Sequence, residues 1–182
     1  GKDAFKDNTY ISTIEFPKDS EIQIFEKKAF FSSTLTKIDI PIHLKEIGSY
    51  CFGYTNFLSL VSIPENSELK IIGVEAFANS NIKEIYIPSS VIELKGGFLN
   101  GTDYLKKIEI SQNNKHFIYY KNKFILGRKN TDNDHDYDIL IYVHGEFRKL
   151  KFPSFIKVIG EKVFSKSDIE SIAFTNDSQL EI

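Results

Sequence analysis

Cysteine and histidine are the residue types in this chain that suit nucleophilic or metal chemistry. Cys51 is the only cysteine, so an internal disulfide and a cluster of zinc-binding thiolates are excluded. A catalytic thiol would need a partner histidine and a partly exposed, electropositive setting, and the alternative is a small buried filler. The four histidines, His43, His116, His135 and His144, do not have the spacing of metal ligands. The sequence also contains no phosphate-binding glycine loop, nucleophile elbow or His-Glu-x-x-His motif. It therefore predicts no catalytic residue, cofactor or metal site, and favours a protein that is not an enzyme.

Acidic residues alternate along the run from Asp132 to Asp138, as they do in a calcium-binding loop. The run lacks the glycine of the sixth loop position, where Tyr137 stands, and the glutamate of the twelfth, where Val143 stands. We therefore expect a solvated turn between two strands, Lys123 to Leu126 and Ile139 to Val143. This turn should bind calcium weakly or not at all. Carboxylates elsewhere are expected to be surface charges.

Two sequons for N-linked glycosylation are present, Asn100-Gly101-Thr102 and Asn176-Asp177-Ser178. A chain this rich in asparagine, serine and threonine contains such short motifs by chance. The sequons therefore do not establish secretion.

A short motif that mostly ends in proline recurs at a nearly constant interval along the chain. It indicates the repeating fold that must place the cysteine, histidine and acidic residues discussed above. The steps from Pro17 to Pro41, Pro64, Pro88 and Ser111 are 24, 23, 24 and 23 residues. Such a period is typical of a solenoid, whose units bury their apolar faces only against each other. The copies are Ile14-Glu15-Phe16-Pro17, Ile38-Asp39-Ile40-Pro41, Val61-Ser62-Ile63-Pro64, Ile85-Tyr86-Ile87-Pro88, Ile108-Glu109-Ile110-Ser111 and Leu150-Lys151-Phe152-Pro153.

Each unit has the same internal order of residue types. Apolar residues alternate before the proline, which predicts a strand with one buried face, ended by a residue that cannot donate to a ladder. An apolar residue with a following glycine comes next, as in Ile47-Gly48, and we expect a bend with positive φ or close backbone approach there. A small residue and a phenylalanine close the unit, as in Ala29-Phe30 and Ala76-Phe77. One phenylalanine per unit predicts an internal ladder of aromatic rings.

This unit, apolar-x-x-Ile-x-Ile-Pro followed by Ile-Gly-x-x-Ala-Phe, resembles the repeat of the BspA-like leucine-rich repeat family over nearly the whole chain. It differs from the commoner leucine-rich repeats, which have asparagine or cysteine after the strand where this chain has proline. Residues 91–98 are one residue short and hold Leu94-Lys95 in place of Ile-Gly. Residues 113–147 form a longer variant unit, which the family also shows. The resemblance implies a cell-surface or extracellular protein that engages host matrix or other cells.

The expected fold is a single right-handed, leucine-rich-repeat-like solenoid domain over residues 1–182. We expect roughly six coils of about 23 residues, mostly β with short turns or helical turns, and a parallel sheet on one face. The variant unit at 113–147 is expected to be hairpin-like. Because the chain starts and stops within a unit, we expect it to be a segment of a longer protein. The residues expected to be almost fully buried are Ile38, Ile40, Ile63, Ile85, Ile87, Phe30, Phe52, Phe77 and Phe164.

Composition agrees with such a domain and excludes some partners. The net charge of −2 gives no electrostatic footprint for a nucleic acid. The longest apolar runs are far shorter than the roughly 20 residues of a membrane helix, so direct membrane insertion is not expected. Hydrophobic residues make up 41% of the chain, enough for one core.

The side chains that alternate with the buried strand residues must point outward, and they vary from unit to unit. Variation on a constant scaffold is typical of a recognition surface, and also of a solvated surface that binds nothing. Leu60, Ser62, Glu84 and Tyr86 are expected to be neighbours in an amphipathic centre, with lysines towards the C-terminal end. The candidate protein-binding face consists of Lys37, Asp39, Leu60, Ser62, Glu84, Tyr86, Lys107, Glu109, Lys149 and Lys151.

The leading hypothesis is a non-catalytic module for protein binding or adhesion, with host extracellular matrix or another cell surface as the expected partner. The alternative is a structural spacer or intracellular scaffold with no ligand of its own. The incomplete coils around Phe5 and Ile182 leave apolar edges, so we also expect self-association through uncapped ends.

Overall fold

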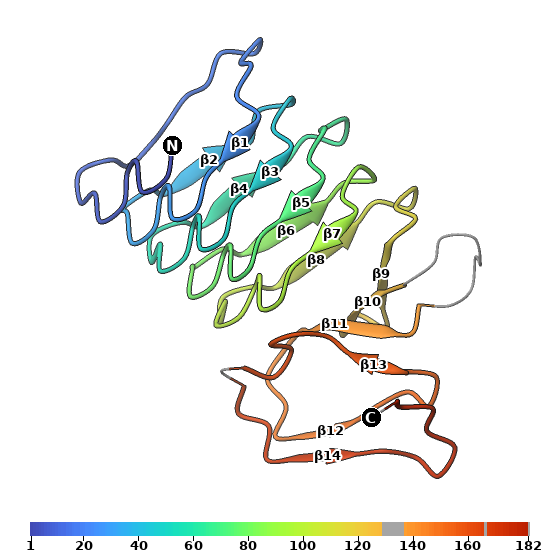
Figure 1. Ribbon diagram of the computed structural model, residues 1–182. Coiled ribbons are helices and arrows are strands. Elements are labelled where there is room, and N and C mark those ends of the chain that lie inside the picture. Colours follow the sequence, from blue (N-terminus) through green and yellow to red (C-terminus); the bar gives the residue numbers. More distant parts are fainter. Residues whose placement is uncertain (129–136, 166, 182) are drawn as a thin grey trace.

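The chain winds into a stack of flat coils in which short strands of successive coils lie side by side (Figure 1). The computed structural model describes residues 1–128, 137–165 and 167–181, and these ranges contain no helix. The predicted solenoid with parallel strands is therefore confirmed.

The strands predicted before Pro41, Pro64, Pro88, Ser111 and Pro153 all form and pair in parallel. Each ends one or two residues before the next proline or Ser111, because proline has no N–H to donate to a ladder. The expected strand before Pro17 is not formed, and a bond from the Thr36 N–H to the Ser12 carbonyl (2.9 Å) ties that segment to the next coil. The parallel pairs are β2 (Lys37–Asp39) with β4 (Leu60–Ser62) and β6 (Glu84–Ile87) with β8 (Lys107–Ile110).

A second parallel sheet, which the sequence analysis did not predict, runs beside the first. Its strands are only two residues long, and each places one buried apolar side chain in register with the next coil. Four of them hydrogen-bond continuously: β1 (Ile24–Phe25), β3 (Glu46–Ile47), β5 (Ile71–Ile72) and β7 (Glu93–Leu94).

The glycine that follows β3 and the glycine that follows β5 are required by a close approach and not by a positive φ. A Cβ on Gly48 would lie 2.7 Å from the Phe25 carbonyl oxygen, and a Cβ on Gly73 would lie 2.6 Å from the Ser49 nitrogen. Positive φ occurs two residues further on, at Tyr50 and its equivalents. Of the two expected causes, positive φ and close backbone approach, the second is the one that the structure shows.

The corner that follows is held by backbone hydrogen bonds that alternate in direction. Phe30 and Phe52 donate their N–H groups to the next coil, at Cys51 (2.9 Å) and Ala76 (2.7 Å). The residues between such donors bond within their own turn, as the Ala29 N–H does to the Glu26 carbonyl (3.1 Å). This alternation requires two residues with positive φ, the left-handed backbone conformation, four positions apart in a corner. They form two columns: Asp3, Lys28, Tyr50, Glu75, Gly97 and Lys162; and Asp7, Ser32, Tyr54, Asn79 and Gly101.

Phenylalanine rings stack inside these corners, as the sequence predicts. The centroids of Phe5, Phe30, Phe52 and Phe77 lie 5.2, 5.2 and 5.3 Å apart in successive pairs, and the rings are nearly parallel. Every residue expected to be buried is buried except Phe164, which is only half-buried. The prediction was wrong there because Phe164 lies on the last corner of the described stack, where no further corner covers it.

The buried side chain of Asn114 marks the end of the regular parallel coils. Its amide nitrogen donates to the Pro88 carbonyl (2.8 Å) and the Val91 carbonyl (3.0 Å). Its amide oxygen accepts from the N–H groups of His116 and Phe117. The chain then runs antiparallel, as predicted for a hairpin-like unit, through β9 (Phe117–Tyr120), β10 (Phe124–Gly127) and β11 (Ile139–Val143).

The chain returns to parallel pairing after β11 and contacts the earlier coils again. The Lys162 ammonium lies 2.6 Å from the carboxylate of Glu75, and the Asn100 amide donates to the Lys162 carbonyl (2.9 Å). The last corner therefore lies against a corner 62 residues earlier in sequence. The strands of this part are β12 (Lys149–Lys151), β13 (Val158–Ile159) and β14 (Ser171–Ala173).

The stacked rings predict a large loss of stability when one is removed. Phe52→Ala should lower the free energy of unfolding by roughly 3–5 kcal/mol, because it leaves a cavity between two flanking rings. Urea denaturation measures this change. The control is Phe57→Ala, which removes a ring that is 62% exposed and should cost within about 0.5 kcal/mol. Equal urea midpoints for the two variants would contradict the ladder.

Candidate functional site

The predicted binding residues on β2 and β4 lie opposite one another and point outward. Lys37 pairs in register with Leu60, and Asp39 pairs with Ser62. All four are exposed, while Ile38, between Lys37 and Asp39 on β2, points into the core. Leu60 is therefore an apolar side chain held on an open sheet surface.

The next pair of strands continues this face. Glu84 lies opposite Lys107, and Tyr86 lies opposite Glu109. A bond from the Lys83 N–H to the carbonyl of Ser59 (3.2 Å) sets β6 beside β4. The predicted grouping of β4 and β6 residues is thus present in the structure.

Charges on this face partly neutralise each other. The Lys107 ammonium lies 2.8 Å from the Glu109 carboxylate, two residues along the same strand. The hydrogen bond that the Lys107 ammonium donates to Glu109 raises the pKa of Lys107. Both side chains are more than half exposed, so this ion pair contributes little to stability.

The two remaining predicted residues lie on another ladder. Lys149 and Lys151 pair in register with Ser171 and Ala173 of β14. The antiparallel strands β9 to β11 come between β8 and β12 along the chain, and the ladder of β8 does not continue into β12 (Figure 1). We define the strand face as the eight residues on β2, β4, β6 and β8: Lys37, Asp39, Leu60, Ser62, Glu84, Tyr86, Lys107 and Glu109.

Cys51 is fully buried in the core, which matches the prediction of a small filler. Burial raises the pKa of its thiol far above the ordinary value, so the nucleophilic thiolate does not form at neutral pH. Among the residues that the structure describes, no group of three or more His, Cys, Asp or Glu side chains is placed to hold a metal ion. No helix in the described ranges is long and apolar enough to cross a membrane.

The surroundings of three histidines are described by the structure. His144 bridges β9 and a preceding coil, with Nδ1 bonded to the Tyr119 hydroxyl and Nε2 3.0 Å from the Leu105 carbonyl. His43 contacts the Glu68 carboxylate at 2.9 Å. Partial burial, and then the charge of Arg128, lower the pKa of His116. His135 lies outside the described residues, as does most of the predicted calcium-like run, so that prediction stays open.

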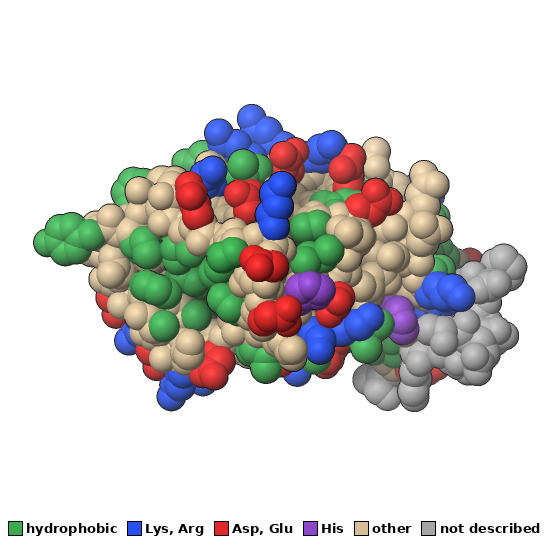
Figure 2. Space-filling model, turned by 90° about the horizontal axis from the view of Figure 1, so that it is seen from above, with side chains coloured by type: hydrophobic (Ala, Val, Ile, Leu, Met, Phe, Trp, Pro, Cys, Tyr) green, Lys and Arg blue, Asp and Glu red, His purple; other side chains and the backbone are tan. Residues whose placement is uncertain are grey.

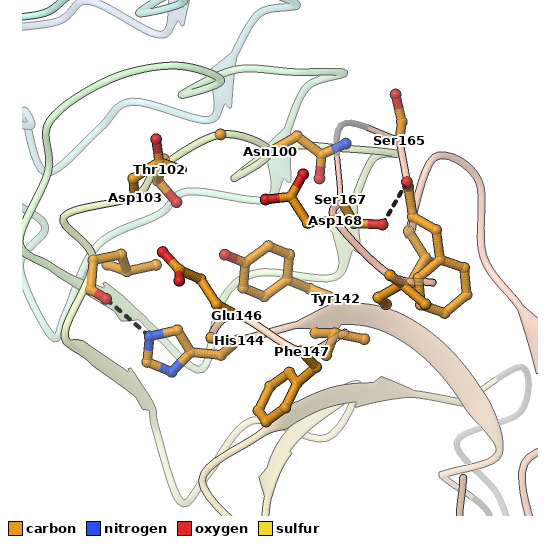
Figure 3. A pocket seen from close by; sticks show the side chains of 17 residues that line it. Asn100, Thr102, Asp103, Tyr142, His144, Glu146, Phe147, Ser165, Ser167 and Asp168 are labelled. Atoms are coloured by element: carbon orange, nitrogen blue, oxygen red, sulfur yellow. Dashed lines mark hydrogen bonds between the residues drawn. The ribbon is translucent and has the colours of Figure 1, made fainter. Parts of the chain in front are cut away.

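A pocket of about 220 Å³ lies where β11 ends, between the coil of residues 100–105 and the last corner. Figure 3 shows the carboxylates of Glu146 and Asp168 pointing into one space beside the Tyr142 hydroxyl, with Asp103 across from them. Tyr142 is buried, and this burial raises the pKa of its hydroxyl. Among the residues that the structure describes, a range that omits Lys166, those that line the pocket include no lysine or arginine.

This pocket could not be predicted from the sequence, because three separate segments build it. Asn100 to Leu105, Tyr142 to Phe147 and Val163 to Ile169 come together only when the last coil folds back. One signal was available. Glu146 and Asp168 each stand directly before the apolar residue that opens a repeat, so the two acids share a phase.

The N-terminal end of the stack exposes apolar side chains, which gather on the face seen from above in Figure 2. A depression of about 480 Å³ there is lined chiefly by apolar atoms. Phe5 is 38% exposed, although its equivalents in later coils are buried or half-buried, and Ile24, which lines the same depression, is 51% exposed. We define this surface as the N-terminal apolar face; its residues are Phe5, Ile14, Phe16, Ile22 and Ile24.

The two sequons differ in accessibility. The Asn100 side chain is 95% buried and its amide is bonded to Lys162, so a glycan there is incompatible with this fold. Asn176 is exposed.

Comparison with known proteins gives a consistent family and fold. The family model described as the BspA type leucine rich repeat region matches residues 1–123 and 142–181, in six copies. No curated protein matches the chain. The crystal structure of the pneumococcal vaccine antigen PcpA superposes with a TM-score of 0.75 at 25% identity, over 92% of this chain and 46% of that one.

Two further solved structures share the fold. A leucine rich cell surface protein from Faecalibacterium prausnitzii has a TM-score of 0.66 at 19% identity, over 84% of this chain and 39% of that one. A leucine-rich repeat protein from Eubacterium ventriosum has a TM-score of 0.64 at 23% identity, over 88% of this chain and 47% of that one. The chain thus spans less than half the length of each of these three proteins.

The burial of Cys51 predicts an inert thiol. Native protein at pH 8 should not react with Ellman's reagent over minutes, because the reagent needs an accessible thiolate. Full denaturation should release one reactive thiol per chain. Rapid, stoichiometric reaction of the native protein would contradict this prediction and reopen a chemical role for the residue.

Proposed function

Because this chain belongs to the BspA-type leucine-rich repeat family, we propose that it is a non-catalytic, protein-binding module of a surface or secreted protein. Membership of a repeat family supports protein binding, since such repeats present extended, rigid surfaces. One similar structure is described as a cell surface protein and another as a vaccine antigen, which supports the surface location.

The observation that carries the proposal is the strand face. Its backbone is held by parallel pairing of β2 with β4 and of β6 with β8, and by the bond from Lys83 to Ser59 between the two pairs, while its side chains differ from coil to coil. A rigid surface loses little conformational entropy when a partner docks. Leu60 and the half-buried Tyr86 supply apolar area beside carboxylates and lysines, the mixture found at protein interfaces. Adhesion to host matrix or to another cell is the form of binding that we propose.

We also propose that residues 1–182 act as one solenoid domain, in which 113–147 is a variant unit. Packing across the boundary supports this. The rings of Phe98 and Tyr142 lie 6.0 Å apart, and Phe117 and Ile125 belong to the same buried cluster as the regular coils.

The N-terminal apolar face supports self-association as a secondary property. Strand β1 is an edge strand with exposed apolar neighbours, a combination that favours pairing with another chain. A second copy could cover these side chains as each coil covers the one before it.

Loss of Tyr86 should weaken binding at the strand face. A partner is first identified by pull-down from extracellular-matrix and cell lysates, and its affinity is then measured by calorimetry. If Tyr86 is an anchor, Tyr86→Ala should cost roughly 2 kcal/mol of binding free energy, because its ring loses buried contact area. The matched control is Lys70→Ala, an exposed residue outside the face, which should change nothing. Equal affinities for Tyr86→Ala and wild type would move the interface elsewhere, and failure to find any partner would favour a spacer.

Self-association through the N-terminal apolar face should depend on concentration. Sedimentation equilibrium of the wild type should show a rising average mass, which Ile24→Lys should reduce, because a buried unpaired ammonium opposes contact. The control is Ile92→Lys, a change of the same kind at a residue that is 50% exposed and outside this face. A monomer at all concentrations would refute the idea.

A further inference from the structure

Three strongly exposed aromatic rings occupy one repeat position, three residues before the first outward strand position of each repeat. Tyr10, Phe57 and Tyr104 are 94%, 62% and 58% exposed. Each stands directly before the apolar residue that opens its repeat, and these apolar residues are at least partly buried. We define these three residues as the aromatic row. Their exposure excludes a role in the core.

Backbone hydrogen bonds place the row in a single column. The residues two positions further along bond from coil to coil, with N–H to carbonyl distances between 2.8 and 3.2 Å. Because successive coils are tied at this point, the residues before them are also in line. The rings therefore recur on every second coil. The bonded column is Ser12, Thr36, Ser59, Lys83 and Lys106.

The coils between the rings carry small polar side chains that are already bonded to the scaffold. The Thr34 hydroxyl donates to the Ile11 carbonyl (3.0 Å), and the Asn81 amide donates to the Asn56 carbonyl (2.5 Å). Both are shorter than an aromatic side chain. The rings are thus separated by shallow gaps.

The spacing of the rings selects one kind of ligand backbone. Neighbouring strands lie about 4.8 Å apart, so every second coil gives a repeat of roughly 9.6 Å. A polyproline II helix has three residues per turn with a rise of about 3.1 Å each, which gives a repeat of roughly 9.3 Å. Aromatic-lined surfaces are also the usual docking sites for such helices. One proline per turn would meet each ring.

The same repeat position is acidic further along the chain. In the units after Tyr104 it is occupied by Glu146 and Asp168, whose carboxylates point into the pocket (Figure 3). Asp103, the neighbour of Tyr104, also lines this pocket, together with the aromatic side chains of Tyr142 and Phe147. Carboxylates beside aromatic rings complement a lysine or arginine side chain. The aromatic row therefore leads to an acidic pocket, which would attract a lysine or arginine side chain.

We propose that the aromatic row and the pocket together bind a proline-rich protein segment in the polyproline II conformation, with a lysine or arginine at one end that enters the pocket. This proposal deepens the proposed function, on which it rests, by naming the chemistry of a protein partner. A neutral glycan could stack on the rings, but it would leave the three carboxylates without a role.

The test is fluorescence anisotropy on the whole chain with a labelled peptide of nine prolines followed by arginine. At about 3.1 Å per residue, its prolines extend past the roughly 19 Å from Tyr10 to Tyr104. We expect saturable binding at micromolar concentrations, weaker binding of the same peptide ending in glutamate, and none of a glycine-serine peptide ending in arginine. No saturable binding of the proline-arginine peptide overturns the proposal.

Variants separate the two halves of the site. Phe57→Ala should weaken the proline-arginine peptide about tenfold or more, as loss of a central aromatic anchor does. The matched control Phe155→Ala removes a partly exposed ring outside the row and should stay within about twofold. Asp168→Asn combined with Glu146→Gln should abolish the preference for arginine over glutamate. Circular dichroism should be unchanged in all three. Equal binding by Phe57→Ala and wild type overturns the proposal.

Two other outcomes also count against it and leave the proposed function intact. One is binding of a chitin oligosaccharide that depends on Phe57, with no binding of the proline peptides, which would make the row a glycan platform. The other is a protein partner whose affinity depends on Tyr86 and not on Phe57.

Discussion

Each coil of this protein covers the next, and the backbone of the corners makes that stacking specific. Along each corner, one N–H group bonds within its own turn and the next N–H group bonds to the neighbouring coil. A shift of one coil against the next would break both kinds of hydrogen bond. Left-handed residues such as Lys28 and Ser32, four apart, make this alternation possible. The ring of Phe30, between them, then stacks on Phe52 at 5.2 Å. Strand pairing, glycine placement and side-chain exposure all follow from this fixed corner.

The same constraint explains why the surface is available for recognition. A backbone that repeats from one regular coil to the next fixes where each outward side chain stands but not which residue type it is. Charged, apolar and aromatic residues therefore occur at equivalent positions, as Leu60 and Lys37 do on paired strands. When the same residue type occurs at one repeat position in every second unit, the stacked coils place those side chains in a regular line. The rings of the aromatic row are aligned in this way.

The interruption of the repeat after Asn114 creates a pocket between coils. Asn114 satisfies four backbone groups and so allows the chain to leave the parallel ladder. The antiparallel strands that follow prevent β12 from joining β8, and the last corner is held instead by the pair of Lys162 and Glu75 and by the amide of Asn100. A pocket results between coils that do not stack directly.

The sequence by itself determined the parallel coils, all but the first of the expected strands, and the buried phenylalanines of the regular coils, because each depends on a pattern that repeats within a few residues. It determined the hairpin-like unit as well, because two apolar runs follow one another there. It also determined which side chains of the strand face point outward, since alternation fixes the side of a strand. Only the tertiary structure decided the second sheet, whose two-residue strands are too short to show a period. It alone placed Lys149 and Lys151 on a separate ladder, left Phe164 half-exposed and assembled the pocket. These features depend on contacts between segments up to 87 residues apart, such as Glu75 and Lys162, and no local pattern encodes such a distance.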